Sequence, residues 1–431
     1  MNSAPARTFV SLVAPGGALL AAALVLVQIP ATHATAPPVV NFLLWMAILG
    51  ALAMAWRFQS SRAVFAVLVL CLADRGLAVL GHAPAPAANA GFAVLAVLLP
   101  VNLVFFSAIG ECGLTLTSVG SGLGILSIQA AAVMVLARPE NLEFARWAER
   151  AYLPGGFFTW TPLPQLALLL FGGAIAWLGM RVSLLRKPVD CAFFWSACAA
   201  FAGLQAASPG RASSLYFAAA VLMFAGALVE TSYRLAFLDE LTGLPGRRSF
   251  NQELPALAGN YSIAMVDVDH FKRFIDPYGH DTGDQVLRMV AGRLARVGGG
   301  RAFRHGGEEF AIIFAGQNVE DCTEHLEELR VAIARSSFMV RGPDRSQRRR
   351  DERRYAKPGR RPVGYARTRT AVTVSIGVAE ASARLATPEL VMEAADQALY
   401  YAKGQGRNRV EIARKTRRAP APPPMAATSR A

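Results

Sequence analysis

The sequence predicts an α-helical transmembrane bundle of about eight spans, followed by a cytoplasmic α/β domain. Over its 431 residues the chain is 53% hydrophobic and only 17% charged, with a mean hydropathy of +0.33. Residues 1–230 hold 11 Lys and Arg against 7 Asp and Glu, whereas residues 231–431 hold 33 against 23. This balance excludes a wholly water-soluble enzyme, and it excludes disorder over most of the chain.

Apolar stretches long enough to cross a hydrocarbon core of about 30 Å recur through the first half. The predicted spans are residues 8–29, 39–56, 63–80, 90–109, 123–137, 163–180, 189–207 and 213–230. The fifth is short for a span. We therefore assign residues 1–233 to a polytopic membrane domain that acts as a sensor or anchor.

The distribution of basic residues predicts the orientation of this domain. An even number of spans places both ends of the chain on the same side. The loops near His33 and His82, on the opposite side, carry no Lys or Arg. The short loops on the side of the termini carry Arg57, Arg62, Arg181, Arg186 and Lys187. By the positive-inside rule both termini are cytoplasmic.

Other features of the first half leave alternatives open. The first span could also be a cleaved signal peptide, since residues 34–36 are small, and cleavage would leave seven spans. Residues 138–162 mix Arg and Glu with aromatic residues and predict an amphipathic segment at the outer interface. Asp74 and Arg75 inside the third span predict an intramembrane ion pair, or alternatively a relay or ligand site. The five cysteines show no CxxC spacing and predict neither a disulfide framework nor a zinc site.

The second half alternates strand-length and helix-length patterns, which predicts an α/β domain over residues 234–413. Residues 261–268 form a continuous apolar run that ends in acid, as a buried central strand does. Two further strands are joined by a tight glycine turn. In chain order the expected elements are a strand at 261–268, a helix at 281–296, strands at 301–305 and 308–314, a helix at 319–336, a strand at 371–380, a helix at 388–403 and a strand at 409–412.

Two segments of this half are expected to be disordered. Residues 341–370 carry 12 basic and 3 acidic side chains, too polar a composition for a packed core. Such an insertion could attract anionic lipid, RNA or a nucleotide triphosphate, or it could be a solvated loop with no partner. No specific nucleic-acid partner is expected. The tail 414–431 is rich in Ala, Pro and Arg.

Acidic residues gather at one end of the predicted sheet. Asp267 and Asp269 end the apolar strand, and Glu308 and Glu309 follow the Gly306-Gly307 turn. Oxygen ligands of this kind suit Mg²⁺, which takes one or two carboxylates together with water and phosphate oxygens. Basic side chains in the same domain could supply charge for a triphosphate. These are Lys272, Lys403 and Arg407.

The order of these motifs resembles that of the GGDEF family, the diguanylate cyclases. The resemblance covers residues 235–412 and rests on residues 239–244, 267–272, 278–280, 283–284, 306–310, 375–377, 395–403 and 406–408. It implies a palm-like α/β domain that works as a homodimer. Each protomer would hold one GTP, and the 3′-hydroxyl of each GTP would attack the α-phosphate of the other, giving cyclic di-GMP and pyrophosphate.

The resemblance also implies roles for individual residues. Asp267, the backbone carbonyl of Val268 and Glu308 would hold Mg²⁺ or Mn²⁺, with Glu309 as a further ligand. One of the two glutamates would assist deprotonation, and we place Glu308 first. The substrate-binding residues would be Lys272, Ile275, His280, Asp284, Lys403 and Arg407, with Lys272, Lys403 and Arg407 on the phosphates and Asp284 on the guanine edge.

The chain departs from the family pattern at three places. Ile275 stands where an Asn usually hydrogen-bonds guanine, so we expect weaker GTP binding and a KM about tenfold lower after Ile275→Asn. Val297 and Gly300 stand where an Arg and an Asp bind inhibitory product. Gly246 stands where an Asn is usual.

The sequence therefore predicts a membrane-bound diguanylate cyclase. One alternative is a degenerate domain that binds GTP without turnover and acts as a signalling module, which Ile275 makes plausible. A second is a transporter regulated by its nucleotide-binding domain. The signal that the membrane domain detects has no signature in the sequence.

Overall fold

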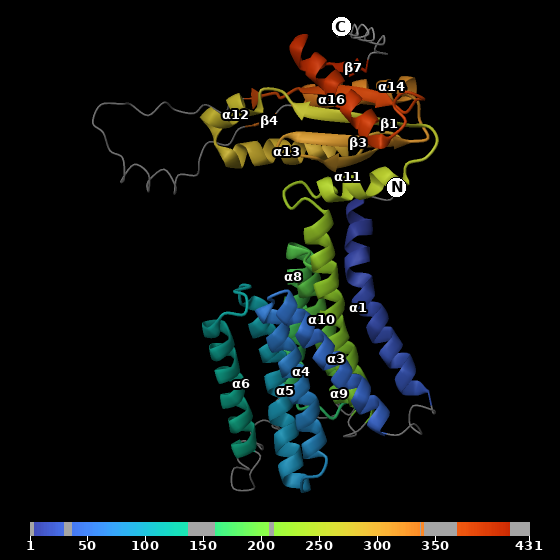
Figure 1. The fold of residues 1–431 in the computed structure, drawn as a ribbon. Helices are drawn as coiled ribbons and strands as arrows, with labels where there is room; N and C mark the ends of the chain where they lie inside the picture. The colour runs from blue at the N-terminus through green and yellow to red at the C-terminus, as the bar shows by residue number, and fades with distance from the viewer. Residues whose placement is uncertain are drawn as a thin grey trace, which may run out of the picture. The chain divides into compact units, whose positions relative to one another are not determined.

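The computed structural model describes residues 4–29, 37–136, 160–206, 211–336, 338–339 and 369–413 (Figure 1). Contacts divide the chain into two compact units, Met1–Tyr233 and Arg234–Ala431. The predicted amphipathic segment 138–162 and the insertion 341–370 lie almost wholly outside the described residues. The small residues 34–36 and the tail 414–431 lie outside them as well.

The first unit is built from helices. They are α1 (Ala4–Gln28), α3 (Pro37–Arg57), α4 (Ser61–Leu80), α5 (Ala85–Ala108), α6 (Leu116–Leu136), α8 (Gln165–Leu185), α9 (Pro188–Gln205) and α10 (Arg211–Phe237). Six of the described helices are long and apolar enough to cross a membrane: α3, α4, α5, α6, α8 and α10. The apolar part of α1 is shorter, and α9 carries Asp190. The expected number of about eight spans therefore remains a prediction.

Small and aromatic side chains form the core of this unit. Alanines with no exposed surface, including Ala63, Ala66, Ala199 and Ala200, let the helix backbones approach closely. Phe193, Phe217 and Phe224 fill the remaining space and are also fully buried. Such packing relies on shape and dispersion rather than on a difference in polarity.

Buried charges link the helices. Arg62 Nη2 lies 2.6 Å from Asp190 Oδ1, and Arg181 Nη2 lies 3.1 Å from the same oxygen. Two of the five basic residues that predict the orientation are therefore paired inside the unit. Arg75 pairs with Asp74, and Ser214 Oγ donates to Asp74 Oδ1 (2.7 Å), which confirms the predicted ion pair.

The second unit has a five-stranded mixed sheet with the order β2-β3-β1-β6-β7 (Figure 1). Only the β6–β7 pair is parallel. Its strands are β1 (Tyr261–Val268), β2 (Arg301–Arg304), β3 (Glu309–Ala315), β6 (Val374–Glu380) and β7 (Val410–Ile412). Its helical elements are α11 (Arg247–Glu253), η3 (Leu254–Ala256), α12 (Phe271–Tyr278), α13 (His280–Leu294), α14 (Val319–Ala334) and α16 (Pro388–Gly404).

Strand alternation divides the hydrophobic core into two layers. Ala264, Val266 and Val268 of β1 pack with α12, α13 and α14 on one face of the sheet. Ile263 and Met265 pack with α11, η3 and α16 on the other. All eight residues of β1 are buried, as the continuous apolar run predicts for a central strand.

The structure contains elements that the sequence does not predict. Helix α11 and η3 lie before the first strand, where no element is expected. We expect turns between the first strand and residue 281, but residues 271–278 form α12, and α13 begins at His280. A short two-stranded sheet pairs β4 (Phe338–Met339) with β5 (Arg369–Thr370), so the last two residues of the predicted loop are strand. Pairing β4 with β5 brings the two ends of the basic insertion together.

Candidate active site in the α/β unit

Strand register brings the acidic residues together. Asp267 of β1 lies opposite Glu309 of β3 and opposite Ser375 of β6. The side chain of Asp267 is 7% exposed. Burial raises the pKa of Asp267, the nearby Lys403 ammonium lowers it, and the Glu309 and Asp269 carboxylates raise it further. The net direction is upward, so the carboxylate lacks full compensation of its charge.

Lys403 occupies this acidic end of the sheet. Its Nζ lies 2.9 Å from Asp267 Oδ2. The last turn of α16 holds it there because α16 packs directly on β6 at Gly377. A β-carbon at Gly377 would lie 2.1 Å from the backbone nitrogen of Leu399 and 2.2 Å from the carbonyl oxygen of Ala395, so only glycine permits this approach.

The Gly306-Gly307 turn presents Glu308 beside Asp267. The amides of His305 and Gly306 both donate to the Glu309 carbonyl, at 2.9 and 3.0 Å, which closes the turn. A β-carbon at Gly306 would lie 2.8 Å from a Glu309 carboxylate oxygen. The pKa of Glu308 is raised by burial, then by the Asp267 carboxylate, while Lys403 opposes the shift. A half-buried carboxyl with a raised pKa is suited to accept a proton near neutral pH.

Arg304 fixes this turn, a role that the sequence does not reveal. Its Nη2 donates to the Gly307 carbonyl (2.7 Å) and its Nη1 to Asp239 Oδ1 (2.7 Å). Burial alone would raise the pKa of Asp239, but hydrogen bonds from Thr242 and Arg304 outweigh it and lower the pKa. Asp239 therefore stays ionised and anchors Arg304. The motif at residues 239–244 gives a partial signal, since it places an acid in the loop that Arg304 contacts.

Asp269 has a structural role. It accepts hydrogen bonds from Thr373 Oγ1 (2.6 Å), Ser375 Oγ (2.7 Å) and the backbone amide of Asn408 (3.1 Å). The last bond holds the loop after α16, where Arg407 and Asn408 adopt φ values of 61° and 47°. Asp269 thus accepts three hydrogen bonds and positions the segment that carries Arg407.

The remaining predicted substrate residues lie on or beside α12 and α13. Lys272 and His280 are exposed, and Asp284 is half-buried. Ile275 does not point freely to solvent. It packs on the core, and a β-carbon at Gly283 would lie 2.9 Å from Ile275 Cγ1. This packing joins α12 to α13, while Ile275 remains partly exposed, so its place among the substrate-binding residues stays a prediction.

The donor set at the acidic end fits a hard divalent cation. Asp267 and Glu308 are carboxylates with raised pKa values, and a cationic group, Lys403 Nζ, already lies against Asp267. Within the described parts of the chain, no group of three or more His, Cys, Asp or Glu side chains is arranged to hold a metal. Mg²⁺ does not require one, because it takes one or two carboxylates and completes its shell with other oxygens.

The turn before β2 is built from three glycines. Gly299 has a φ of 68°, and a β-carbon there would lie 2.1 Å from Gln317 Nε2. A β-carbon at Gly300 would lie 2.7 Å from both Ile312 and Phe314. The position at which the family pattern has an Asp is therefore filled by neighbouring side chains.

Comparison with known proteins agrees with this geometry. The model of the GGDEF domain of diguanylate cyclases matches residues 236–350 and 343–409. The chain is 34% identical to diguanylate cyclase DgcP of Pseudomonas aeruginosa over 194 residues, which is 43% of this chain and 25% of that protein. It is 33% identical to the response regulator PleD of Caulobacter vibrioides over 193 residues, 42% of this chain and 37% of that protein.

Among solved structures, the GGDEF domain of DgcB from Caulobacter crescentus, crystallised in complex with c-di-GMP, is 37% identical. The match covers 41% of this chain and 96% of that chain, with a TM-score of 0.34. The chain thus spans less than half the length of the two curated relatives but almost all of the isolated domain. From the family match, the identities and the site, the C-terminal unit of this chain is a member of the GGDEF domain family.

Proposed function

We propose that this protein is a membrane-anchored diguanylate cyclase that converts two GTP molecules into cyclic di-GMP and pyrophosphate. The single observation that carries the proposal is the acidic end of the sheet, where Asp267, Glu308 and Lys403 lie together. The family match and the relatives named as diguanylate cyclases support the same activity. Because the match covers only part of those relatives, the activity of the whole chain is our inference.

Substrate binding follows from the charges around this end of the sheet. Lys403, Lys272 and Arg407 would neutralise the triphosphate, and Lys403 would exchange Asp267 for a phosphate oxygen. Asp284, half-buried on α13, would accept hydrogen bonds from the guanine edge, with His280 at the start of the same helix. Ile275 would support α12 rather than contact the base.

The chemical step is an attack by the 3′-hydroxyl of one GTP on the α-phosphate of the other. A bond forms between the 3′-oxygen and the α-phosphorus, the α–β phosphoanhydride bond breaks, and pyrophosphate leaves. Glu308 would accept the proton of the hydroxyl, and its raised pKa suits this role. Bound Mg²⁺ or Mn²⁺, held by Asp267, the Val268 carbonyl, Glu308 and Glu309, would supply charge neutralisation at the phosphates.

Each product molecule requires this step twice, so two sites must face one another. We propose a homodimer of the GGDEF domain, with one GTP in each protomer. The six apolar helices support insertion in a bacterial inner membrane, with the GGDEF domain in the cytoplasm. Helix α10 begins in the first unit and ends at Phe237 in the second, so movement of this helix would reach the Asp239 loop directly.

The test measures cyclic di-GMP made by the purified full chain from GTP and Mg²⁺. We expect product from the native chain and almost none from Glu308→Gln. The matched control is Glu328→Gln, the same substitution at an exposed position of α14. A native chain that binds GTP but forms no product would establish the alternative of a non-catalytic signalling module.

A further inference from the structure

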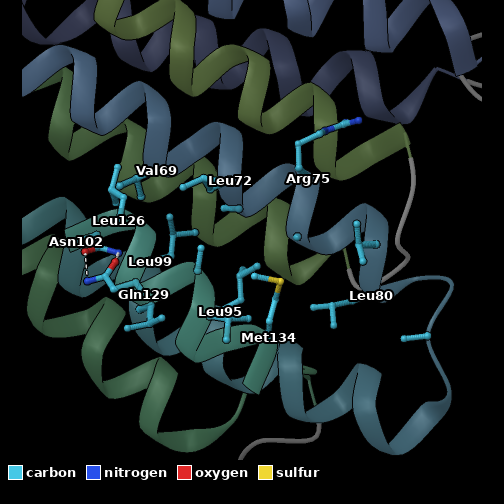
Figure 2. Close-up of a pocket in the computed structure, with 17 residues that line it drawn as sticks. Val69, Leu72, Arg75, Leu80, Leu95, Leu99, Asn102, Leu126, Gln129 and Met134 are labelled. Carbon is cyan, nitrogen blue, oxygen red and sulfur yellow. Dashed lines mark hydrogen bonds between the residues drawn. The ribbon is translucent and has the colours of Figure 1, made fainter. Parts of the chain in front are cut away.

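A cavity of about 480 Å³ lies in the helical unit between α4, α5 and α6 (Figure 2). Its walls are mainly apolar, and its size falls within the range of small-molecule sites. The larger side chains on the wall include Val69, Leu72, Leu95, Leu99, Leu126 and Met134. A molecule bound there would be mostly hydrocarbon.

The cavity offers no free charge. Arg75 is the one charged residue among the described residues that line it. Its guanidinium is engaged by Asp74, by Asn41 Oδ1 at 3.5 Å and by the ring of Trp45, whose centroid lies 5.7 Å away. Figure 2 shows the end of this side chain directed away from the cavity. An anionic ligand would therefore lack a counter-ion, and its desolvation would be uncompensated.

One polar feature remains on the wall. Asn102 Nδ2 donates to Gln129 Oε1 (2.8 Å), and Gln129 Nε2 donates to Asn102 Oδ1 (3.0 Å), as Figure 2 shows. Each amide has two N–H donors, so the pair keeps one further donor on each side chain. These two donors point away from each other, and either of them can meet an alcohol or carbonyl oxygen. In apolar surroundings such a hydrogen bond discriminates strongly between an oxygenated ligand and a plain hydrocarbon.

Of the three helices that line the cavity, α6 is the least buried. Only 11% of its apolar span is buried, against 50% for α4 and 67% for α5. The hydrogen bonds between Asn102 and Gln129 join α6 to α5, and Leu126 is a buried apolar side chain of α6. A ligand between α6 and the other two helices would bury more of this surface and favour one position of α6.

We propose that this cavity binds an uncharged, lipid-soluble molecule with an extended hydrocarbon body and one alcohol or carbonyl oxygen. The hydrocarbon lies against the leucines of α4 and α5, and the oxygen accepts from the remaining N–H of one amide, that of Asn102 or that of Gln129. This site is separate from the GTP site, and the proposal stands independently of cyclase activity.

Photolabelling of the purified full chain tests the location. The probes are hexadecan-1-ol bearing a diazirine on its chain and the matched diazirine hexadecane. We expect labelled residues on the cavity faces of α4, α5 and α6, and about tenfold less labelling after addition of excess unlabelled hexadecan-1-ol. Labelling that is spread over all outward helix faces, or that unlabelled alcohol does not reduce, overturns the proposal.

A pair of neighbouring substitutions gives the matched control. Ala130 lines the cavity, whereas Ala131 is exposed on the same helix and does not line it. Ala130→Trp should fill the cavity and reduce labelling about tenfold, and Ala131→Trp should leave it unchanged. Equal labelling of the two variants overturns the assignment.

The Asn102–Gln129 pair determines which chemical class of ligand we expect the cavity to bind. In the native chain the alcohol should label about fivefold more efficiently than the hydrocarbon. Replacing both partners, Asn102→Leu with Gln129→Leu, removes the donors without leaving one of them unpaired, so the helices keep their packing. This double variant should label equally with both probes. Equal labelling already in the native chain would overturn the hydrogen-bonded class of ligand.

Discussion

Both units bury an aspartate against a cationic side chain, but the two pairs differ in how completely they are enclosed. Asp190 in the helical unit is fully buried and meets two arginines, Arg62 and Arg181. Asp267 in the α/β unit meets one lysine, Lys403, whose side chain is 32% exposed, and carboxylates surround it. Asp190 is closed to solvent, so no dissolved cation can take the place of its arginines, and the ion pair holds the helices together. The second pair can exchange its lysine for another cation, as an active site requires.

The largest effect is expected at the exchangeable pair. Asp267→Asn keeps the shape of the side chain and removes its charge, so activity should fall about 100- to 1,000-fold while the fold survives. Cyclic di-GMP formation by the full chain measures this. Asp321→Asn at the start of α14, beyond the opposite end of β3, is the control and should keep full activity. Near-normal turnover in Asp267→Asn would remove Asp267 from the site.

The enclosed pair should govern stability instead. Arg62→Leu leaves Asp190 with Arg181 alone and deletes bonds to the carbonyls of Phe106 and Ser107, at a cost of about 3 kcal/mol. All six tryptophans precede residue 234, so thermal unfolding followed by tryptophan fluorescence reports on the helical unit alone.

The matched control for that measurement is Arg57→Leu at the exposed end of α3, which should change stability by less than about 0.5 kcal/mol. If the two variants melt together, the buried pair has no structural role, and the contrast between the two aspartates fails.

The pH dependence of activity sharpens the same contrast. The pKa values of Asp267 and Glu308 are raised above their ordinary values, so both carboxyls gain protons at a higher pH than free side chains do. Activity should therefore be lost as the pH falls through the raised values.

Lys403 lowers both of these pKa values, so Lys403→Gln should move the acid limb of kcat/KM to higher pH. Lys272→Gln, on the exposed face of α12, should change KM but leave the position of the acid limb unchanged. An acid limb that shifts equally in both variants would contradict a specific role for Lys403.

A substitution at Ile275 distinguishes the role that the family pattern implies from the packing that the structure shows. The family pattern predicts that Ile275→Asn lowers the KM for GTP about tenfold. The structure predicts a different result, because Ile275 on α12 packs against Gly283 of α13. We expect the KM to stay within about twofold and stability to fall by about 1–2 kcal/mol. A tenfold lower KM in steady-state kinetics would show that the side chain at this position faces the base.

The smallest expected effect is that of product on rate. Without a charged pair at Val297 and Gly300, progress curves should stay linear as cyclic di-GMP accumulates, after allowance for competition at the active site. Initial rates with added cyclic di-GMP measure this directly. Tight noncompetitive inhibition would indicate another binding surface.

The sequence predicts most of the expected elements of the α/β unit to within two residues, because burial and glycine turns are local signals. The start of β6 is an exception, at Val374 rather than residue 371. Helix α12 is not predicted, since Pro277 and charged neighbours such as Lys272 and Asp276 resemble a turn. The roles of Arg304 and Asp269 depend on partners far along the chain, at Asp239 and Asn408, and no local pattern carries them. The pairing of Lys403 with Asp267 also depends on tertiary packing.

The helical unit was less predictable in detail. Hydropathy locates its helices but not the pairing inside them, such as that of Asp190 in α9, which arginines from other helices enclose. The Asp74–Arg75 pair was predictable because a charged residue in an apolar run must find a partner. The cysteines form no disulfide among the described residues; Cys112 is exposed, and burial raises the pKa of Cys322 to about 11.

The glycine turn before β2 also limits how this domain can evolve. Gly300 contacts Ile312 and Phe314 so closely that an acidic side chain fits only if one of those core residues becomes smaller. A new Arg at position 297 would not complete the charged pair without an acidic residue at position 300. A mutational route to an Arg and an Asp at these two positions would therefore pass through intermediates that lose stability before both charges are present.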